Sequence, residues 1–183
     1  VKSQYCQIIK IILTLREQME RSVPVYPEDF LCYLFPMKSI TPVLKSEYEA
    51  VTDLWERSVR ATHHFLTEEN IRYFRPLILN NYLDAVELGC IRDHAGRIEA
   101  FMGILDGKLE MLFVEPELRG SGLGKMLVQH AVNKLGVTKV DVNEANEQAV
   151  AFYKKMGFVQ TGYSELDGSG KPFPLIHMEI VAE

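Results

Sequence analysis

A glycine-rich loop between a strand-like run and a helical pattern is the first place where residue spacing predicts chemistry. Residues 112–132 read LFVEPELRGSGLGKMLVQHAV. A Walker phosphate loop needs Ser or Thr where Met126 stands, and a dinucleotide fingerprint needs glycine in place of Lys125. The remaining pattern, Arg-x-x-Gly-x-Gly, opens a helix whose first amides are unpaired at the positive end of its dipole. This favours a phosphate or pyrophosphate ligand; a tight turn without a ligand is the alternative.

A second polar pattern lies on a predicted helix in the segment NEQAVAFYKKMGF, residues 146–158. Asn146 and Tyr153 are two helical turns apart, so they share one face at a separation of roughly 10 Å. The adjacent stripe is apolar and consists of Ala149, Phe152 and Met156. A polar pair beside an apolar stripe suits the wall of a ligand cleft. The alternative for Tyr153 is an aromatic residue at the edge of the core, with its hydroxyl in water.

Composition limits the class of protein that carries these motifs. The 183 residues are 47% hydrophobic, with 12 Gly and 8 Pro, which suits one compact domain and excludes disordered and fibrous classes. A net charge of −5 disfavours nucleic acid and suits a cationic substrate such as an amine. The cysteines Cys6, Cys32 and Cys90 are odd in number and widely spaced, which favours a reducing cytosol and argues against a structural zinc.

The elements that must position the motifs can be predicted from hydrophobic periodicity and turn signals. We expect a strand at 38–44, a helix opened by a capping box from Ser46 to Glu49, and a helix that Thr67 starts and Pro76 kinks or divides. Strands follow at 84–92, 97–105 and 108–114, the last two joined by a hairpin at Asp106-Gly107. Then come the helix 122–135, a strand at 139–142, the helix 146–156, and strands at 158–165 and 173–181. The predicted class is mixed α/β, in the order β-α-α-β-β-β-α-β-α-β-β.

The first 36 residues differ from the rest of the chain. The stretch VPVYPEDFLCYLFP follows neither a helix nor a strand period, and the apolar run 8–13 is interrupted by Lys10. We therefore expect no membrane segment. The sequence predicts a domain at 37–183 and, at 1–36, an N-terminal extension that need not belong to the native domain; an ordinary N-terminal helix with a loop is the alternative.

Together these features resemble the GNAT superfamily of N-acetyltransferases over about residues 38–183. The loop 119–124 matches the family pattern Arg/Gln-x-x-Gly-x-Gly/Ala, and 146–158 is similar to its Asn-x-x-Ala-x-x-Phe-Tyr-x-x-x-Gly-Phe helix. The segments SVRATHHFL and GKPFPLIHM also look like bacterial members of the family. The resemblance implies the GNAT acyl-CoA N-acyltransferase fold and acetyl-CoA as cosubstrate, without a metal.

The resemblance also implies roles for individual residues. An amide of the strand Leu112, Phe113 and Val114 would stabilise the thioester oxygen, and Tyr153 would protonate the departing thiolate. The other residues implied in cofactor binding are Arg119, Gly120, Ser121, Gly122, Leu123, Gly124 and Asn146.

The group that takes the amine proton is less clearly indicated. An amine with a pKa of about 10.4 must lose a proton before it attacks. Glu110 alternates onto the side of Leu112 and Val114, although a strand glutamate is more often exposed to solvent. His63 and His64 follow the first helix, where the family often forms its acceptor pocket; a structural histidine is the alternative.

Two functions from different classes fit these patterns. The first is an acetyl-CoA-dependent N-acetyltransferase that acts on a primary amine of a small molecule or peptide, as a cytoplasmic monomer or homodimer without nucleic-acid or membrane partners. The second is a catalytically inactive acyl-CoA-binding regulatory module. Tyr153 favours the enzyme, because a pure binder needs only the phosphate loop.

Overall fold

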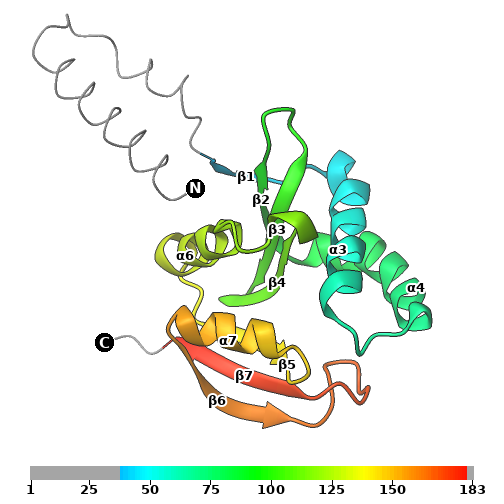
Figure 1. Cartoon of the computed structure of the whole chain (residues 1–183), viewed down its shortest axis with the longest axis vertical. Helices are drawn as coiled ribbons and strands as arrows, with labels where there is room; N and C mark the ends of the chain where they lie inside the picture. The colour runs from blue at the N-terminus through cyan, green and yellow to red at the C-terminus, as the bar shows by residue number, and fades with distance from the viewer. Residues whose placement is uncertain (1–37, 181–183) are drawn as a thin grey trace, which may run out of the picture. The chain divides into compact units, whose positions relative to one another are not determined.

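The computed structural model describes residues 38–180, in which one mixed sheet carries helices on both faces (Figure 1). The strands are β1 (Ile40–Pro42), β2 (Glu87–Arg92), β3 (Ile98–Leu105), β4 (Lys108–Val114), β5 (Lys139–Asn143), β6 (Phe158–Ser164) and β7 (Leu175–Ile180). The main helices are α3 (Tyr48–Thr62), α4 (Glu68–Leu77), α6 (Leu123–Leu135) and α7 (Glu147–Lys155). This order confirms the predicted fold class. The predicted extension 1–36, with Cys6 and Cys32, lies outside the described residues.

The sheet has the strand order β1-β2-β3-β4-β5-β7-β6. All neighbours are antiparallel except β4 and β5, which run parallel. Those two strands are joined only by the pairs Lys108↔Lys139 and Leu109↔Val140 within the described sheet. The remainder of β4 is paired with β3 alone, so the sheet opens into a wedge between β4 and β5.

Two hydrophobic clusters cover opposite faces of the sheet. One lies under α6 and α7 and includes Leu127, Val140 and Phe158, each at most 2% exposed. The other lies under α3 and includes Leu54 and Phe101, both fully buried. Each such side chain contributes roughly 1.5–3 kcal/mol through burial, so both flanks of the wedge are firmly held.

The predicted Asp-Gly hairpin is confirmed at the turn between β3 and β4. Asp106 has φ 48° and Gly107 has φ 74°, which are the positive values that a two-residue type I′ turn requires. The short connection fixes the register of β4 against β3.

A β-bulge in β4 changes the face on which Glu110 lies. Ile104 pairs with Leu109 and Gly103 with Met111, which leaves Glu110 as the extra residue. Strict alternation along the strand predicts that Glu110 lies on the side of Leu112. That expectation is wrong, because the bulge turns Glu110 toward the face where it pairs with Lys108.

Helix boundaries differ from the predictions at two places. The capping box predicted at Ser46 and Glu49 is wrong: the Glu47 carboxylate accepts the Leu44 amide at 2.8 Å and caps the turn before α3. A 3-10 turn, Lys45–Glu47, precedes the helix and shifts the cap. The strand expected from residue 84 begins at Glu87, because 83–85 complete a helical turn.

The predicted start of α4 is confirmed. The Thr67 hydroxyl accepts the Asn70 amide at 3.2 Å as the N-cap. Pro76 lies inside α4, and a π-helical turn, Ile78–Tyr82, follows it. Because proline has no amide hydrogen, the regular helical ladder is interrupted here, as the sequence predicted.

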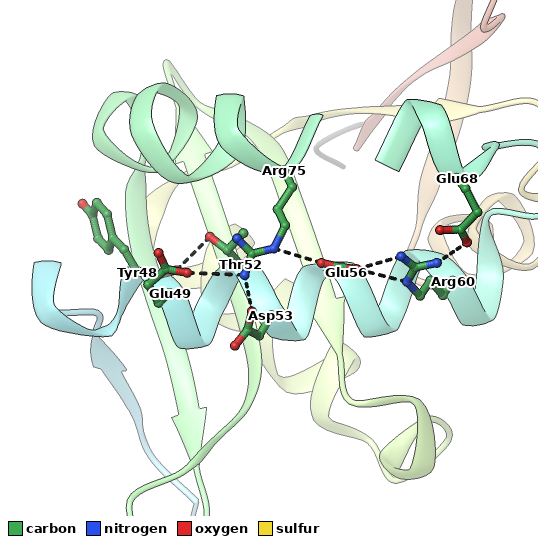
Figure 2. Close-up of polar contacts among 8 residues, drawn as sticks. All are labelled: Tyr48, Glu49, Thr52, Asp53, Glu56, Arg60, Glu68 and Arg75. Carbon is green, nitrogen blue, oxygen red and sulfur yellow. Dashed lines mark hydrogen bonds and ion pairs between the residues drawn. The ribbon is translucent and has the colours of Figure 1, made fainter. Parts of the chain in front are cut away.

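An ion-pair cluster holds α4 against α3 (Figure 2). Arg75 of α4 contacts three carboxylates of α3, with its Nε 2.9 Å from Glu56 Oε2. The other two are Glu49 and Asp53. Glu56 also binds Arg60, which reaches Glu68 at the start of α4. The cluster therefore joins both ends of α4 to the helix that covers the sheet.

We expect Arg75→Met to lower the free energy of unfolding by about 1 kcal/mol at low salt, since networks exceed isolated surface pairs. The loss should shrink in 1 M salt, where the Debye length falls to about 3 Å. Urea unfolding at the two salt concentrations measures both effects. The control Arg97→Met removes an exposed pair with Asp93 and should change little; an equal loss in both variants contradicts the assignment.

No helix within residues 38–180 is long and apolar enough to cross a membrane.

Candidate active site

A cavity of about 350 Å³ lies beside the unpaired part of β4. Its walls come from the end of α3, from β4 with the loop that follows it, and from the start of α7. The volume is at the lower end of the range for small-ligand sites. Every residue predicted to bind the cofactor lines this cavity except Ser121. The Ser121 hydroxyl instead donates to the Leu118 carbonyl at 2.6 Å, within the loop.

The strand edge in the cavity consists of Leu112, Phe113 and Val114. These residues pair with β3 on one side, and their other side faces the wedge, because the β4–β5 ladder ends at Leu109. A strand without a neighbour leaves its amides and carbonyls available to a ligand. The edge can therefore bind an extended, amide-containing chain or donate to a developing oxyanion.

The loop after β4 has the backbone conformation of an anion site. Gly120 and Gly122 have φ values of 80° and 96°. A Cβ on Gly122 would meet nothing within 4 Å, so it is the left-handed backbone that requires glycine there. Gly122 is the N-cap of α6 and supplies no side-chain cap, so the first amides of α6 remain available to a phosphate.

One side chain of the loop contacts α7, and Asn146 caps that helix. Arg119 Nη2 donates to Gln148 Oε1 at 2.8 Å. Asn146, the N-cap of α7, accepts the Ala149 amide at 3.1 Å. Asn143 caps the turn before α7 by accepting the Ala145 amide at 2.9 Å.

Tyr153 lies at the inner wall of the cavity. It is 7% exposed, and its ring packs edge-on against Phe152 and Phe158, with centroid distances of 5.1 and 5.7 Å. Burial raises the pKa of Tyr153 well above the ordinary value for a phenol. The hydroxyl is therefore a neutral donor at physiological pH.

His63 lines the opposite wall, at the end of α3. Its Nδ1 lies 2.7 Å from the Thr62 hydroxyl, and its ring lies 6.3 Å from that of Phe113. Burial lowers the pKa of His63 to about 4, with smaller contributions from Arg119 and His64. The imidazole is neutral at physiological pH. His64 is exposed and lies outside the cavity lining.

Glu110 also lies outside the cavity lining. It is exposed at the bulge, 3.0 Å from Lys108 Nζ. Its position marks the end of the β4–β5 pairing, so it lies next to the wedge on the face opposite α6 and α7.

Five further lining residues were not predicted: Ser58, Thr62, Leu118, Lys125 and Gln148. The Thr62 hydroxyl donates to the Ser58 carbonyl at 2.8 Å, so Ser58 and Thr62 share one face of α3. Their spacing of four could have revealed a polar stripe on an otherwise apolar face, but only packing places that stripe beside β4. Among the described residues, no group of three or more His, Cys, Asp or Glu side chains could hold a metal ion.

Comparison with known proteins agrees with this geometry. Residues 78–160 match the acetyltransferase (GNAT) domain family. The chain is 39% identical over 135 residues to the peptidyl-lysine N-acetyltransferase YjaB of Escherichia coli K12, covering 74% of this chain and 91% of that protein. It is 29% identical over 115 residues to the peptidyl-lysine N-acetyltransferase YiaC of the same organism, covering 62% and 78%.

Solved structures show the same fold. The solution structure of apo YjaB from E. coli superposes with a TM-score of 0.73 at 37% identity, covering 80% of this chain and 99% of that one. The PaiA N-acetyltransferase of Thermoplasma acidophilum, solved in complex with coenzyme A, has a TM-score of 0.58 at 19% identity, covering 79% and 99%.

The lowered pKa of His63 predicts a specific pH dependence of stability. The His63 imidazole has a pKa near 6.5 in the unfolded chain and about 4 in the folded protein. Between these two pH values the unfolded chain binds a proton and the folded protein does not, so the free energy of unfolding falls as the pH drops from about 6.5 to 4. Between pH 7 and pH 5, we expect the free energy of unfolding to fall by about 2 kcal/mol less in His63→Gln than in the wild type. Urea unfolding at both pH values measures this. His94→Gln, at an exposed turn, is the control, and equal losses in all three proteins refute the prediction.

Proposed function

The chain belongs to the GNAT acetyltransferases and is an acetyl-CoA-dependent N-acetyltransferase, and we propose that its acceptor is the side-chain amine of a lysine in a protein or peptide. The observation that carries this proposal is the 39% identity to a peptidyl-lysine N-acetyltransferase over 91% of that protein. The net charge of −5 also favours a cationic acceptor.

Within this proposal, acetyl-CoA binds along the wedge. The first amides of α6 and the Arg119 guanidinium hold the pyrophosphate, and the free edge of β4 binds the amide-containing pantetheine arm. A backbone amide of residues 112–114 stabilises the thioester oxygen as it becomes negative. This use of the loop is supported by the positive φ values of Gly120 and Gly122.

Tyr153 is the proposed acid. The amine attacks the thioester carbonyl, and collapse of the tetrahedral intermediate breaks the carbon–sulfur bond and releases the CoA thiolate. The Tyr153 hydroxyl protonates that sulfur. Its neutral, buried phenol on the cavity wall supports this role, which an inactive binding module would not need.

Glu110 is the proposed base. Its side chain is exposed beside the wedge, where it can attract an incoming ammonium ion and accept its proton directly or through water. His63 is less suited to this role, because burial and the nearby Arg119 lower its pKa and Arg119 repels an incoming cation. We assign His63 to the wall of the acceptor pocket.

Aromatic residues between His63 and the β6–β7 loop support a lysine acceptor. The ring centroids of His63 and Phe65 are 5.3 Å apart, and those of Phe65 and Phe173 are 6.0 Å apart. In the same region Lys171 Nζ lies 3.8 Å from the centroid of Tyr73. Ring faces attract ammonium groups, so this side of the protein suits an acceptor lysine.

The cellular setting is part of the proposal. The two E. coli relatives support a bacterial enzyme. The acetyl-CoA requirement supports a cytoplasmic one. A monomer or a homodimer remains the expected assembly.

We expect acetyl-CoA-dependent acetylation of peptides that contain an internal lysine. The measurement is free-thiol release, with mass spectrometry to locate the acetyl group. Matched peptides in which the lysine is replaced by arginine, leaving only the N-terminal amine, should react poorly. Acetylation of spermidine or of N-terminal amines without lysine acetylation would contradict the proposed acceptor.

For Tyr153→Phe we expect turnover at saturating acetyl-CoA to fall on the order of 10²-fold, because the acid is lost. Affinity for acetyl-CoA should be nearly unchanged, because the ring packing remains. Thermal shift measures affinity, with Gly122→Glu as the variant that blocks the phosphate site. Unchanged turnover would remove Tyr153 from the mechanism, and a parallel loss of affinity would indicate a binding role.

A further inference from the structure

A chain of polar side chains crosses four strands on the sheet face opposite α6 and α7. Ser164 Oγ lies 2.7 Å from His177 Nε2, and His177 Nδ1 lies 2.6 Å from Asp141 Oδ1. The other oxygen of Asp141 lies 2.7 Å from Lys108 Nζ, which is also 3.0 Å from Glu110 Oε1. None of these five residues lines the cavity described above.

This series of polar side chains ends at Glu110, at the apex of the wedge. The last pair between β4 and β5 is Leu109↔Val140, and the next residue on each strand is a carboxylate, Glu110 or Asp141. The side chains on either side of Asp141, Val140 and Val142, are buried beneath α6 and α7, so Asp141 faces the other way. The two carboxylates therefore meet one shared ammonium, Lys108, where the strands begin to separate.

The electrostatics show that this contact favours the charged forms. Burial alone would lower the pKa of Lys108, but hydrogen bonds to Asp141 and Glu110 reverse the direction and raise it. Burial would likewise raise the pKa of Asp141, yet Lys108 and His177 lower it. Lys108 is thus a fixed cation shared by two anions.

The neighbouring cations Lys139 and Arg57 have carboxylate partners of their own. On the same sheet face, Lys139 of β5 pairs with Glu179 of β7 at 3.6 Å. On the covering helix α3, Arg57 pairs with Glu115.

We propose that Lys108, Asp141 and His177 are positioning residues that set the charge and orientation of Glu110 as it receives the acceptor's proton. The inference rests on the proposed function through the role of Glu110 as base. Asp141 draws Lys108 away from Glu110, and His177 holds Asp141 in the orientation that does so. The strength of the base is then set from two strands away.

Ser164, His177 and Asp141 also have the contact order of a Ser-His-Asp nucleophilic triad. Ser164, however, lies on the edge strand β6 and outside the cavity, so the acetyl donor and Ser164 are on different parts of the sheet. Ser164→Ala tests the difference, because a nucleophile would be essential and the end of a positioning chain would not.

Two variants should move the pH profile of kcat/KM in opposite directions, measured with any amine that the wild type acetylates. Lys108→Met removes the cation that favours the ionised carboxylate, so the acid limb should move about 0.5–1 pH unit higher. Asp141→Asn leaves Lys108 to Glu110 alone and removes an anion, so the limb should move lower by a similar amount. Lys139→Met, which removes the neighbouring pair, should leave the limb in place.

Three further measurements complete the test. His177→Ala should lower kcat more than it raises KM, and His177→Gln, which retains a hydrogen-bonding side chain, should recover most of the loss. Ser164→Ala should change kcat less than twofold. Glu110→Gln should abolish the acid limb.

The inference is overturned if the acid limb of the kcat/KM profile stays in place in both Lys108→Met and Asp141→Asn. It is also overturned if the limb moves in the same direction in both variants. A complete loss of turnover in Ser164→Ala, or an unchanged pH profile in Glu110→Gln, also overturns it. If the proposed lysine acceptor is wrong, the wild-type enzyme will acetylate small amines but no lysine peptide, which is a different result from those above.

Discussion

The early end of pairing between β4 and β5 is the constraint on which the rest of the structure depends. Among residues 38–180, only two residue pairs join these parallel strands, and the backbone of residues 112–114 has no sheet partner on the side of β5. Such an edge would be unstable in isolation, but the buried clusters on both faces hold the two halves of the sheet. Hydrophobic packing thereby maintains an unsatisfied strand edge inside the molecule, where a substrate can use it.

Burial shifts the pKa values of Tyr153 and His63 in the cavity in opposite directions, and both shifts favour the neutral side chain. The pKa of Tyr153 is raised and that of His63 is lowered, so phenol and imidazole are both neutral at physiological pH. The fixed charges lie at the ends: Arg119 at the loop that opens α6, and Glu110 with its partners at the apex of the wedge. An anionic cosubstrate and a cationic acceptor are therefore favoured at different places.

Irregular helical turns adjoin both α3 and α4. A 3-10 turn precedes α3, and Pro76 with the π-helical turn follows most of α4. The carboxylates of α3 and the guanidinium of Arg75 keep these two helices together. Since α3 also supplies Ser58, Thr62 and His63 to the cavity, this ion-pair cluster indirectly fixes one of its walls.

The sequence alone determined the element order, the hairpin at Asp106-Gly107, the loop 119–124 and the face shared by Asn146 and Tyr153. All of these follow from local rules: periodicity, turn chemistry and helix capping. The tertiary structure decided where Glu110 points, because a bulge depends on how β3 and β4 pair. It also brought Lys108, Asp141 and His177 together from three strands. Contacts between residues so distant in sequence leave no periodic signal, and sheet register alone makes them neighbours.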